Sequence, residues 1–362
     1  MKKILFVIGS LQAGGAERVA TNLCSYWAEH ADLDVTLVTS NVADSDFYKL
    51  SDKVKRLSID FSFNNSSILS VVKEQFSRFF KIHSVLKQQA PDIIVLSTTE
   101  ISIRFLFNLI FSRKKIIVCE HNNYYALSST FKRLCRTVLY KKASHVFVLT
   151  ERDRVTYLEK KIVADNKIVV MPNPLGIECE SPNIDKQENL LLAVGRLCEQ
   201  KSFDRLIEAM SDINPNFILK ILGDGPDKQA LQKKIDDLSL GSRVELVGKV
   251  KDISKYYQSA TLLLMTSKFE GLPMVINEAN NFGVPVISFD CPTGPAEMIE
   301  NNSNGLLVKN GDIIGFSDTV NNLISKPEAL ASMRNVSIKM SKEYSISVIT
   351  SKWLKFFDIE QS

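Results

Sequence analysis

MKKILFVIGSLQAGGAERVATNLCSYWAEH, residues 1–30, decides the fold class. A continuous apolar run, Ile4–Ile8, leads into a glycine-containing loop and then into a segment of helical period, Ala16–His30. A strand that is apolar throughout is typical of a parallel sheet with helices on both faces, because neither face meets water. The opening residues therefore predict the first strand–loop–helix unit of a parallel α/β fold.

The same alternation continues to about residue 172 and predicts one doubly wound, Rossmann-like unit. Its strands are expected at Ile4–Ile8, Val35–Thr39, Ile93–Ser97, Ile116–Cys119, His145–Leu149 and Ile168–Met171. Its helices are expected at Ala16–His30, Val71–Gln89, Thr130–Lys142 and Arg152–Lys161.

A polar segment without periodicity, Glu178–Glu188, predicts a linker, after which the pattern restarts. Strands are expected at Leu190–Val194, Phe217–Leu222, Val244–Val247, Leu262–Met265 and Val286–Phe289, with helices at Phe203–Met210, Lys228–Leu238 and Met274–Asn281. The length of 362 residues suits two domains. We expect residues 1–172 and 173–342 to form them, with a C-terminal helix within 343–362 packing back on the first. Ligands should bind in a cleft between the domains, beyond the carboxyl ends of the strands.

The composition indicates a protein of a reducing compartment. The six cysteines are widely spread and form no Cys-x-x-Cys pair. The first apolar run ends at Ile8, too early for a signal peptide, and no other run is long enough to span a membrane. We therefore expect a cytoplasmic protein.

Positive charge is concentrated in the first half of the chain. Residues 1–175 hold 25 Lys and Arg against 16 Asp and Glu, whereas the remainder holds 20 against 25. No nucleic-acid-binding signature is present, so we expect no nucleic acid partner. Two helical segments mix cations with apolar residues and predict peripheral contact with an anionic membrane surface. They are Val72, Lys73, Phe76, Arg78, Phe79, Phe80, Lys81, Leu86 and Lys87, and Phe131, Lys132, Arg133, Leu134, Arg136, Val138, Leu139, Lys141 and Lys142. Ordinary amphipathic helices with solvated charges are the equal alternative.

Several candidate binding residues directly follow predicted strands. Gly14 and Gly15 precede a helix, where backbone N–H groups can face a phosphate, although a simple tight turn is as good an interpretation. His121 follows another strand and can hydrogen-bond a sugar hydroxyl or carry a proton. Arg196 ends the first strand of the second half and Lys201 follows it; two cations at this place suit a diphosphate.

The most informative stretch is Phe269-Glu-Gly-Leu-Pro-Met-Val-Ile-Asn-Glu-Ala279. Pro273 suits the first turn of a helix, so Glu270 falls in the preceding loop and Glu278 in the second turn. This spacing can place Glu270 beside a reacting sugar while Glu278 accepts from ribose hydroxyls. Two surface carboxylates are the alternative.

In combination and order, these motifs resemble the family-4 retaining glycosyltransferases of the GT-B fold over nearly the whole chain. The resemblance rests on Gly-Gly-Ala-Glu-Arg18, on Gly195-Arg-Leu with the later lysine, on Glu270-Gly-Leu-Pro with a second glutamate, and on Asn304–Val308. The stretch Cys291–Glu297 resembles the family's bacterial cell-surface polysaccharide enzymes. Asn173-Pro174 departs from the family's usual Asn-Gly.

The resemblance implies a role for each of the matching residues. Arg196 and Lys201 would bind the donor diphosphate, Glu278 the ribose, and Glu270 the donor sugar. His121 would face that sugar as a second catalytic residue, and Gly15 would let backbone approach the phosphate. Donor binding would extend to the helix N-terminus at Gly271, Leu272 and Met274.

The expected activity is transfer of a hexose or N-acetylhexosamine from a nucleoside diphosphate sugar, with UDP as the favoured nucleotide. The acceptor would be a glycan, free or linked to polyprenyl diphosphate, in the synthesis of O-antigen, capsule or lipopolysaccharide at the inner face of the cytoplasmic membrane. Retention of configuration follows from the resemblance. No metal or cofactor is expected, because the nucleotide sugar is a substrate and the two Asp-x-Asp stretches, Asp32–Asp34 and Asp44–Asp46, read as solvated acidic residues. A nucleotide-sugar epimerase of the same fold and a non-catalytic binding protein stay open.

Overall fold

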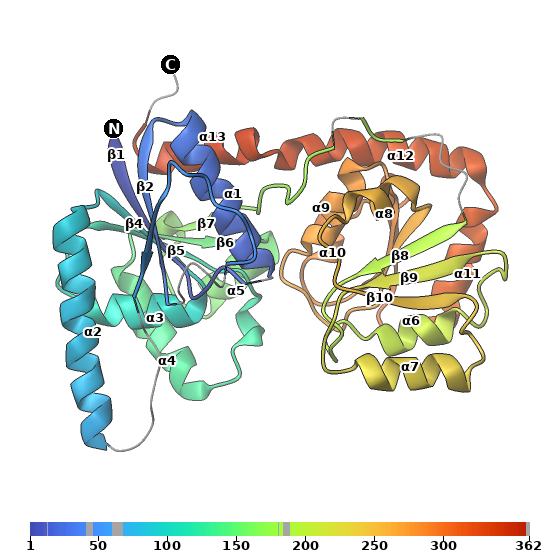
Figure 1. Ribbon diagram of the computed structural model, residues 1–362, viewed down its shortest axis with the longest axis horizontal. Helices are drawn as coiled ribbons and strands as arrows, with labels where there is room; N and C mark the ends of the chain where they lie inside the picture. The colour runs from blue at the N-terminus through green and yellow to red at the C-terminus, as the bar shows by residue number, and fades with distance from the viewer. Residues whose placement is uncertain (13, 41–45, 60–67, 180, 184–188, 360–362) are drawn as a thin grey trace. The chain divides into compact units, whose positions relative to one another are not determined.

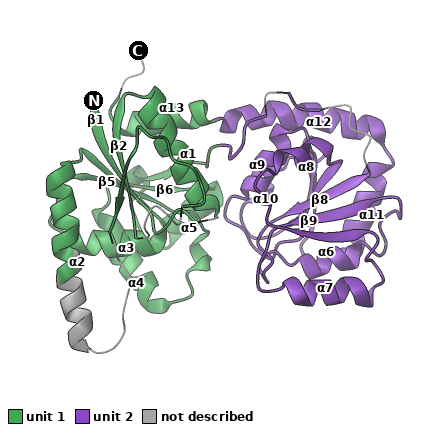
Figure 2. Ribbon diagram, viewed as in Figure 1, with its two compact units in different colours: residues 1–174, 346–362 green, residues 175–345 purple. Residues whose placement is uncertain are grey.

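The computed structural model describes residues 1–362 except 13, 41–45, 60–67, 180, 184–188 and 360–362. The chain divides into two compact units, Met1–Pro174 with Ile346–Ser362, and Leu175–Ser345 (Figure 2). These divisions fall a few residues from the boundaries expected at 172 and 343. Most of the expected linker, including residues 184–188, lies outside the described residues.

Unit 1 is a parallel sheet with strand order β3-β2-β1-β4-β5-β6-β7 (Figure 1). Its strands are β1 Lys2–Val7, β2 Leu33–Thr39, β3 Lys55–Ser58, β4 Ile93–Ser97, β5 Lys115–Cys119, β6 His145–Val148 and β7 Ile168–Val170. Its helices are α1 Gly15–His30, α2 Ile68–Gln89, α3 Thr99–Asn108, α4 Thr130–Leu139, α5 Glu151–Glu159 and α13 Ile346–Phe356, with short 3-10 helices η2 Tyr124–Ala126, η3 Tyr140–Lys142 and η4 Asp165–Lys167.

Unit 2 repeats this plan with strand order β10-β9-β8-β11-β12-β13, again parallel. Its strands are β8 Leu190–Val194, β9 Ile218–Leu222, β10 Val244–Gly248, β11 Leu262–Met265, β12 Val286–Asp290 and β13 Gly305–Lys309. Its helices are α6 Phe203–Ala209, α7 Lys228–Asp237, α8 Ser254–Ser259, α9 Met274–Asn281, α10 Pro295–Met298, α11 Ile313–Ile324 and α12 Pro327–Ser341, followed by η5 Lys342–Tyr344. The predicted fold class, two doubly wound parallel-sheet units, is confirmed.

Each sheet reverses its strand order at one point, and this reversal positions the candidate site. In unit 1 it lies between β1 and β4, and in unit 2 between β8 and β11. Within each sheet, the connections leave the two strands at the reversal in opposite directions. A crevice therefore opens between the loops at the carboxyl ends of those two strands. The loops after β8 and β11 carry Arg196 and Glu270, and His121 lies in the loop after β5, the neighbour of β4.

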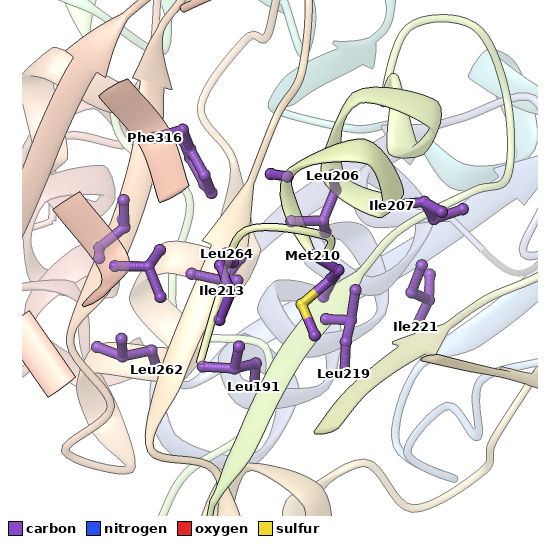
Figure 3. Packing of buried hydrophobic residues seen from close by; sticks show 14 of the residues in the cluster. Leu191, Leu206, Ile207, Met210, Ile213, Leu219, Ile221, Leu262, Leu264 and Phe316 are labelled. Atoms are coloured by element: carbon purple, nitrogen blue, oxygen red, sulfur yellow. The ribbon is translucent and has the colours of Figure 1, made fainter. Parts of the chain in front are cut away.

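Both cores are built from the continuous apolar strands. In unit 2, Leu191, Leu219, Ile221 and Leu264 pack against side chains of the covering helices, among them Leu206 (Figure 3). A cluster of the same kind fills unit 1 around β4 and β5. All six cysteines are free. Among the described residues, no helix is both long and apolar enough to cross a bilayer.

The structure corrects two predictions about surface charge. Arg136 and Leu139, assigned to a membrane-facing helix surface, are buried with 1% and 8% of their surface exposed. Asp34 and Asp46 are not freely solvated, because Lys55 and Arg56 pair with them at 2.9 and 3.0 Å. In α2, the side chains of Val72, Lys73, Phe76 and Arg78 lie outside the described residues.

Helix α13 completes the core of unit 1 although it comes from the end of the chain. The Trp353 ring lies 5.1 Å from the Trp27 ring of α1 and 4.8 Å from the Phe147 ring of β6, centroid to centroid. Phe357 adds a second edge contact to Trp27. The aromatic residues at the end of the chain therefore seal the sheet face that α1 also covers.

We predict that Trp353→Ala lowers the free energy of unfolding of unit 1 by about 3–5 kcal/mol, because truncating a buried tryptophan loses apolar burial and leaves a cavity. Trp27 and Trp353 are the two tryptophans of the chain and both belong to unit 1, so tryptophan fluorescence in a urea titration reports on this unit. Lys352→Ala, on an exposed position of the same helix, is the control. An unchanged unfolding midpoint for Trp353→Ala would contradict the prediction.

Candidate functional site

An ion pair joins the two strand-end loops at the switch point of unit 2. Lys201 Nζ lies 2.6 Å from Glu270 Oε1, and the Ser267 hydroxyl donates to the same oxygen at 2.6 Å. The side chains of Lys201 and Glu270 are only 17% and 7% exposed. The residues predicted to bind phosphate and sugar are thus in contact with each other, largely withdrawn from solvent and held in defined positions.

Gly195 makes room for the lysine. A Cβ at this position would approach the Lys201 side chain to 3.0 Å, so the stem of the lysine runs directly over the backbone at the end of β8. Lys201 thereby reaches the loop after β11, where Glu270 lies. Any larger residue at position 195 would displace the stem.

Arg196 directly follows Gly195, over which the Lys201 stem runs, but its side chain differs from that of Lys201 in exposure and pairing. It is exposed, and within the described part of the chain it forms no ion pair. Two cations therefore stand at one strand end, Lys201 fixed by a carboxylate and Arg196 open to solvent. The second is available to an anion without first losing a protein partner.

A second loop holds Glu270 and the residues after it in place. The Thr293 hydroxyl donates a hydrogen bond to the Glu270 carbonyl. Thr293 has φ of +64°, a conformation that a β-branched residue adopts only when its surroundings impose it. Gly294 follows at φ +89°, and a Cβ there would come within 2.4 Å of the Gly271 carbonyl oxygen. The 291–294 loop is therefore pressed against the backbone of Glu270 and Gly271.

Helix α9 begins directly after Gly271, Leu272 and Pro273, with Met274 as its first residue. The first N–H groups of a helix have no partner within it, and the helix dipole adds partial positive charge there. Helix α9 thus starts in the loop that contains Glu270. Because Lys201 pairs with Glu270, the carboxylate that holds the lysine lies in the loop that leads directly into this helix start.

Glu278 lies in the second turn of α9 and is buried, with 3% of its surface exposed. The Tyr257 hydroxyl donates to its Oε2 at 3.0 Å, and the Tyr257 ring stacks on Phe282 with a centroid distance of 5.4 Å. Tyr257 thereby fixes one carboxylate oxygen of Glu278. Nothing in the local sequence pointed to Tyr257, which lies in α8.

His121 follows β5 in unit 1, and its Nε2 lies 2.8 Å from the hydroxyl oxygen of Ser97, the last residue of β4. Burial lowers the pKa of His121 to about 4, so the ring is neutral at pH 7. Its Nδ1 is buried and has no partner among the described residues. His121 also lines a small pocket together with apolar side chains such as Phe6, Leu23, Met171 and Trp353.

A buried carboxylate precedes the histidine. Glu120 accepts from the Thr99 hydroxyl at 2.6 Å and, through its other oxygen, from the Tyr140 hydroxyl. Burial raises the pKa of Glu120, while these hydroxyls and the nearby Arg136 guanidinium favour the charged form. Glu120 therefore ties the His121 loop to the starts of α3 and η3.

Arg136 is the cation of this network. Its guanidinium stacks on the Tyr124 ring at 4.0 Å from the centroid and donates to the Tyr157 hydroxyl at 3.3 Å. The backbone between Ser97, which contacts His121, and Thr99, which contacts Glu120, is strained, because Thr98 has φ of +77°. The sequence offered one signal for these residues: Ser97 and Thr99 flank the carboxyl end of a predicted strand.

The glycine-containing loop after β1 leads into the first turn of helix α1. Gly14 caps α1 in an extended conformation, and Gly15 is the first helical residue. A Cβ on Gly14 would collide with the Glu17 carboxylate at 2.1 Å. Of the predicted site residues, Gly15 and His121 belong to unit 1. The others belong to unit 2: Arg196, Lys201, Glu270, Gly271, Leu272, Met274 and Glu278.

Comparison with known proteins assigns both halves of the chain. The family model for glycosyl transferases group 1 matches residues 177–340, and the model for glycosyltransferase family 4 matches residues 13–178. The amylovoran biosynthesis glycosyltransferase AmsD of Erwinia amylovora is 31% identical over 367 residues, covering 98% of this chain and 99% of its own length. An α-1,4-N-acetyl-D-galactosaminyltransferase of Campylobacter jejuni, named for an undecaprenol-diphosphate-linked glycan, is 29% identical with 98% of each chain covered.

Solved structures share the fold at lower identity. The lipopolysaccharide outer core galactosyltransferase WaaB superposes with a TM-score of 0.76 at 21% identity, covering 99% of this chain and 100% of its own. A mutant of Staphylococcus aureus TarM, solved in complex with UDP among other ligands, gives a TM-score of 0.83 at 17% identity over the same shares. Full-length similarity in sequence and fold leads to one assignment: this chain belongs to the family-4, group 1 glycosyltransferases and has the GT-B fold.

Proposed function

We propose that this glycosyltransferase moves a hexose or N-acetylhexosamine from a UDP-sugar to a lipid-linked glycan, with retention of anomeric configuration and without a metal ion. The observation that carries the proposal is the Lys201–Glu270 pair beside the exposed Arg196, at the switch point of unit 2. The UDP complex of TarM and the UDP-glucose complex of Anabaena HepE, proteins of the same fold, support the choice of nucleotide.

Charge develops in the proposed reaction as the nucleotide leaves. The anomeric carbon becomes positive and the diphosphate gains negative charge. Arg196, Lys201 and the N-terminus of α9 at Leu272–Met274 would stabilise the leaving group, which is the preorganised electrostatics that dominates many enzyme mechanisms. Lys201 has three N–H donors, so it can keep Glu270 and still donate to a phosphate oxygen.

Glu278 and Tyr257 would hold the ribose. A carboxylate oxygen can accept more than one hydrogen bond, so Glu278 could accept from the ribose hydroxyls while the Tyr257 hydroxyl holds its Oε2. Glu270, already paired with a lysine, serves in this proposal to contact the donor sugar and to position Lys201. His121, neutral at the working pH, would hydrogen-bond the sugar from unit 1.

The proposed acceptor determines where the enzyme works. The Campylobacter relative, named for an undecaprenol-diphosphate-linked glycan, and the relative named for amylovoran synthesis support a polyprenyl-diphosphate-linked glycan in surface polysaccharide assembly. Such an acceptor lies in the cytoplasmic membrane, so the enzyme would act peripherally at the inner face.

A nucleotide-sugar panel tests the proposal directly. We expect calorimetric binding of UDP and one or more UDP-sugars, slow donor hydrolysis without acceptor, and no loss of turnover in EDTA. Appearance of the epimeric sugar nucleotide would favour the epimerase, and binding without any turnover the non-catalytic protein. Tighter binding of a GDP-, ADP- or dTDP-sugar would overturn the choice of nucleotide alone.

We predict that Lys201→Ala and Arg196→Ala each lower kcat/KM by about 30- to 1000-fold, which corresponds to about 2–4 kcal/mol of lost transition-state stabilisation. Lys268→Ala is the matched control, because Lys268 comes from the loop before Glu270 and pairs at 2.8 Å with the largely exposed Glu199. Initial rates with the donor found in the panel give the ratio. Activity within twofold of wild type in either variant would remove the cation from the mechanism.

The lowered pKa of His121 predicts a stability difference at acid pH. The unfolded chain, with a histidine pKa near 6.5, takes up the proton before the folded one does. The stabilising effect of a neutral His121 is therefore complete above pH 6.5 and is lost as the pH falls toward 4; between pH 7 and 5 the loss is about 2 kcal/mol.

The variant His121→Gln should escape this loss. Its free energy of unfolding, followed by tryptophan fluorescence in urea, should fall by about 2 kcal/mol less than that of wild type between pH 7 and 5. His83→Gln, at an exposed position of α2, should behave as wild type. Equal acid sensitivity of wild type and His121→Gln would show that the ring is not held neutral.

A further inference from the structure

We propose that the outer surface of α3 and α4 docks on an anionic lipid bilayer by inserting apolar side chains into its interface. The docking face consists of Phe107, Ile110 and Phe111 at the end of α3 and Phe131, Leu134 and Val138 along α4. This inference rests on the proposed function, because a membrane-bound acceptor requires the enzyme to reach the bilayer.

Helix α4 presents an apolar stripe to solvent. Phe131, Leu134 and Val138 follow one another at helical spacing, and they are 74%, 61% and 59% exposed. Single exposed apolar residues are ordinary on a protein surface, but three in one line along a helix are not. The stripe is therefore a candidate contact surface.

The opposite face of α4 explains why the stripe is not needed for folding. Arg136 and Leu139 point into unit 1, where Arg136 is held by Tyr124 and Tyr157. Lys132 pairs with Glu100 at the start of α3. Arg136, Leu139 and Lys132 thus attach α4 to the rest of unit 1, and its apolar stripe stays exposed to solvent.

Helix α3 extends the stripe into a patch. It packs beside α4 (Figure 1), Glu100 joins the starts of the two helices, and the α3 residues also contact η3, which follows α4. Helix α3 is therefore tied to α4 at their starts and also to the segment that follows α4. Phe111, just beyond α3, is 95% exposed, and Phe107 is 64% exposed.

The charge around the docking face is predominantly positive, and the exposed Glu100 at the start of α3 is paired with Lys132. Residues 101–150 contain nine Lys and Arg and a single acidic residue, Glu120, which is buried. Exposed cations flank both helix ends: Arg113, Lys114, Lys141 and Lys142. Exposed aromatic and aliphatic side chains surrounded by cations suit the interface of a membrane with anionic headgroups, where apolar burial and electrostatic attraction add. A protein partner would need a complementary acidic rim around an apolar centre; a bilayer offers both in one surface.

Vesicle flotation tests the inference with the full-length protein. We expect wild type to float with vesicles of phosphatidylcholine and phosphatidylglycerol at about 3:1, and at least about tenfold less protein to float with pure phosphatidylcholine or in about 0.5 M NaCl. The variant Phe131→Gln/Leu134→Gln/Val138→Gln, with exposed positions and a helix-compatible residue, should lose at least about tenfold in bound fraction. Lys141→Glu/Lys142→Glu should do the same.

A matched control changes three exposed apolar residues elsewhere. Val155→Gln/Ile218→Gln/Ile314→Gln, at positions 45%, 41% and 71% exposed, should float as wild type does. Wild-type flotation that is independent of the anionic lipid, or retained by the α4 variant, would overturn the inference. So would a wild-type dimer in size-exclusion chromatography that the α4 variant converts to monomer, since the stripe would then be a self-interface.

Transfer to a water-soluble acceptor separates this inference from the proposed function. The α4 variant should keep wild-type rates with such an acceptor and lose activity only when the acceptor is in vesicles. If wild type neither hydrolyses a nucleotide sugar nor transfers sugar to a soluble or a vesicle-bound acceptor, the proposed function fails while the flotation result still stands.

Discussion

The ion pair between Lys201 and Glu270 is the constraint on which the donor site depends. Both groups are withdrawn from water, so each is costly without the other, and removing one leaves an uncompensated charge. The pair also fixes where the lysine Nζ lies before any phosphate arrives. Gly195 makes room for the lysine, Ser267 donates to the Glu270 carboxylate, and the strained Thr293 loop holds the Glu270 backbone through its carbonyl oxygen.

Unit 1 is built around a carboxylate of the same kind. Glu120 is buried at a strand end and is satisfied by two hydroxyls and a neighbouring guanidinium rather than by water. Because Glu120 and His121 are adjacent in the chain, this network also restricts where the histidine can lie. Ser97 then fixes the imidazole itself. In unit 2 the buried Glu270 thus positions Lys201, and in unit 1 the contacts of the buried Glu120 restrict the position of the adjacent His121.

The sequence predicted the central strands well and the contacts between loops poorly. Ile93–Ser97, Leu190–Val194, Leu262–Met265 and helix Met274–Asn281 were predicted to the residue, because continuous apolar runs and Pro273 leave little choice. The edge strands Lys55–Ser58 and Gly305–Lys309 were missed, since edge strands are partly exposed and need no apolar run. Strand-end placement found Lys201 and Glu270, but their pairing spans 69 positions and depends on how two loops pack.

Arg136 shows most clearly what a helical pattern leaves undetermined. A helix that carries cations and apolar residues can turn either set toward the sheet, and the sequence left a membrane-facing helix and an amphipathic helix with solvated charges equally open. The structure buries the cation Arg136, because Glu120 and three tyrosines surround a site that a planar, delocalised cation can fill by stacking and hydrogen bonding at once. Burial of the arginine turns Phe131, Leu134 and Val138 outward. The exposure of this apolar face thus accompanies the burial of a cation beside Glu120.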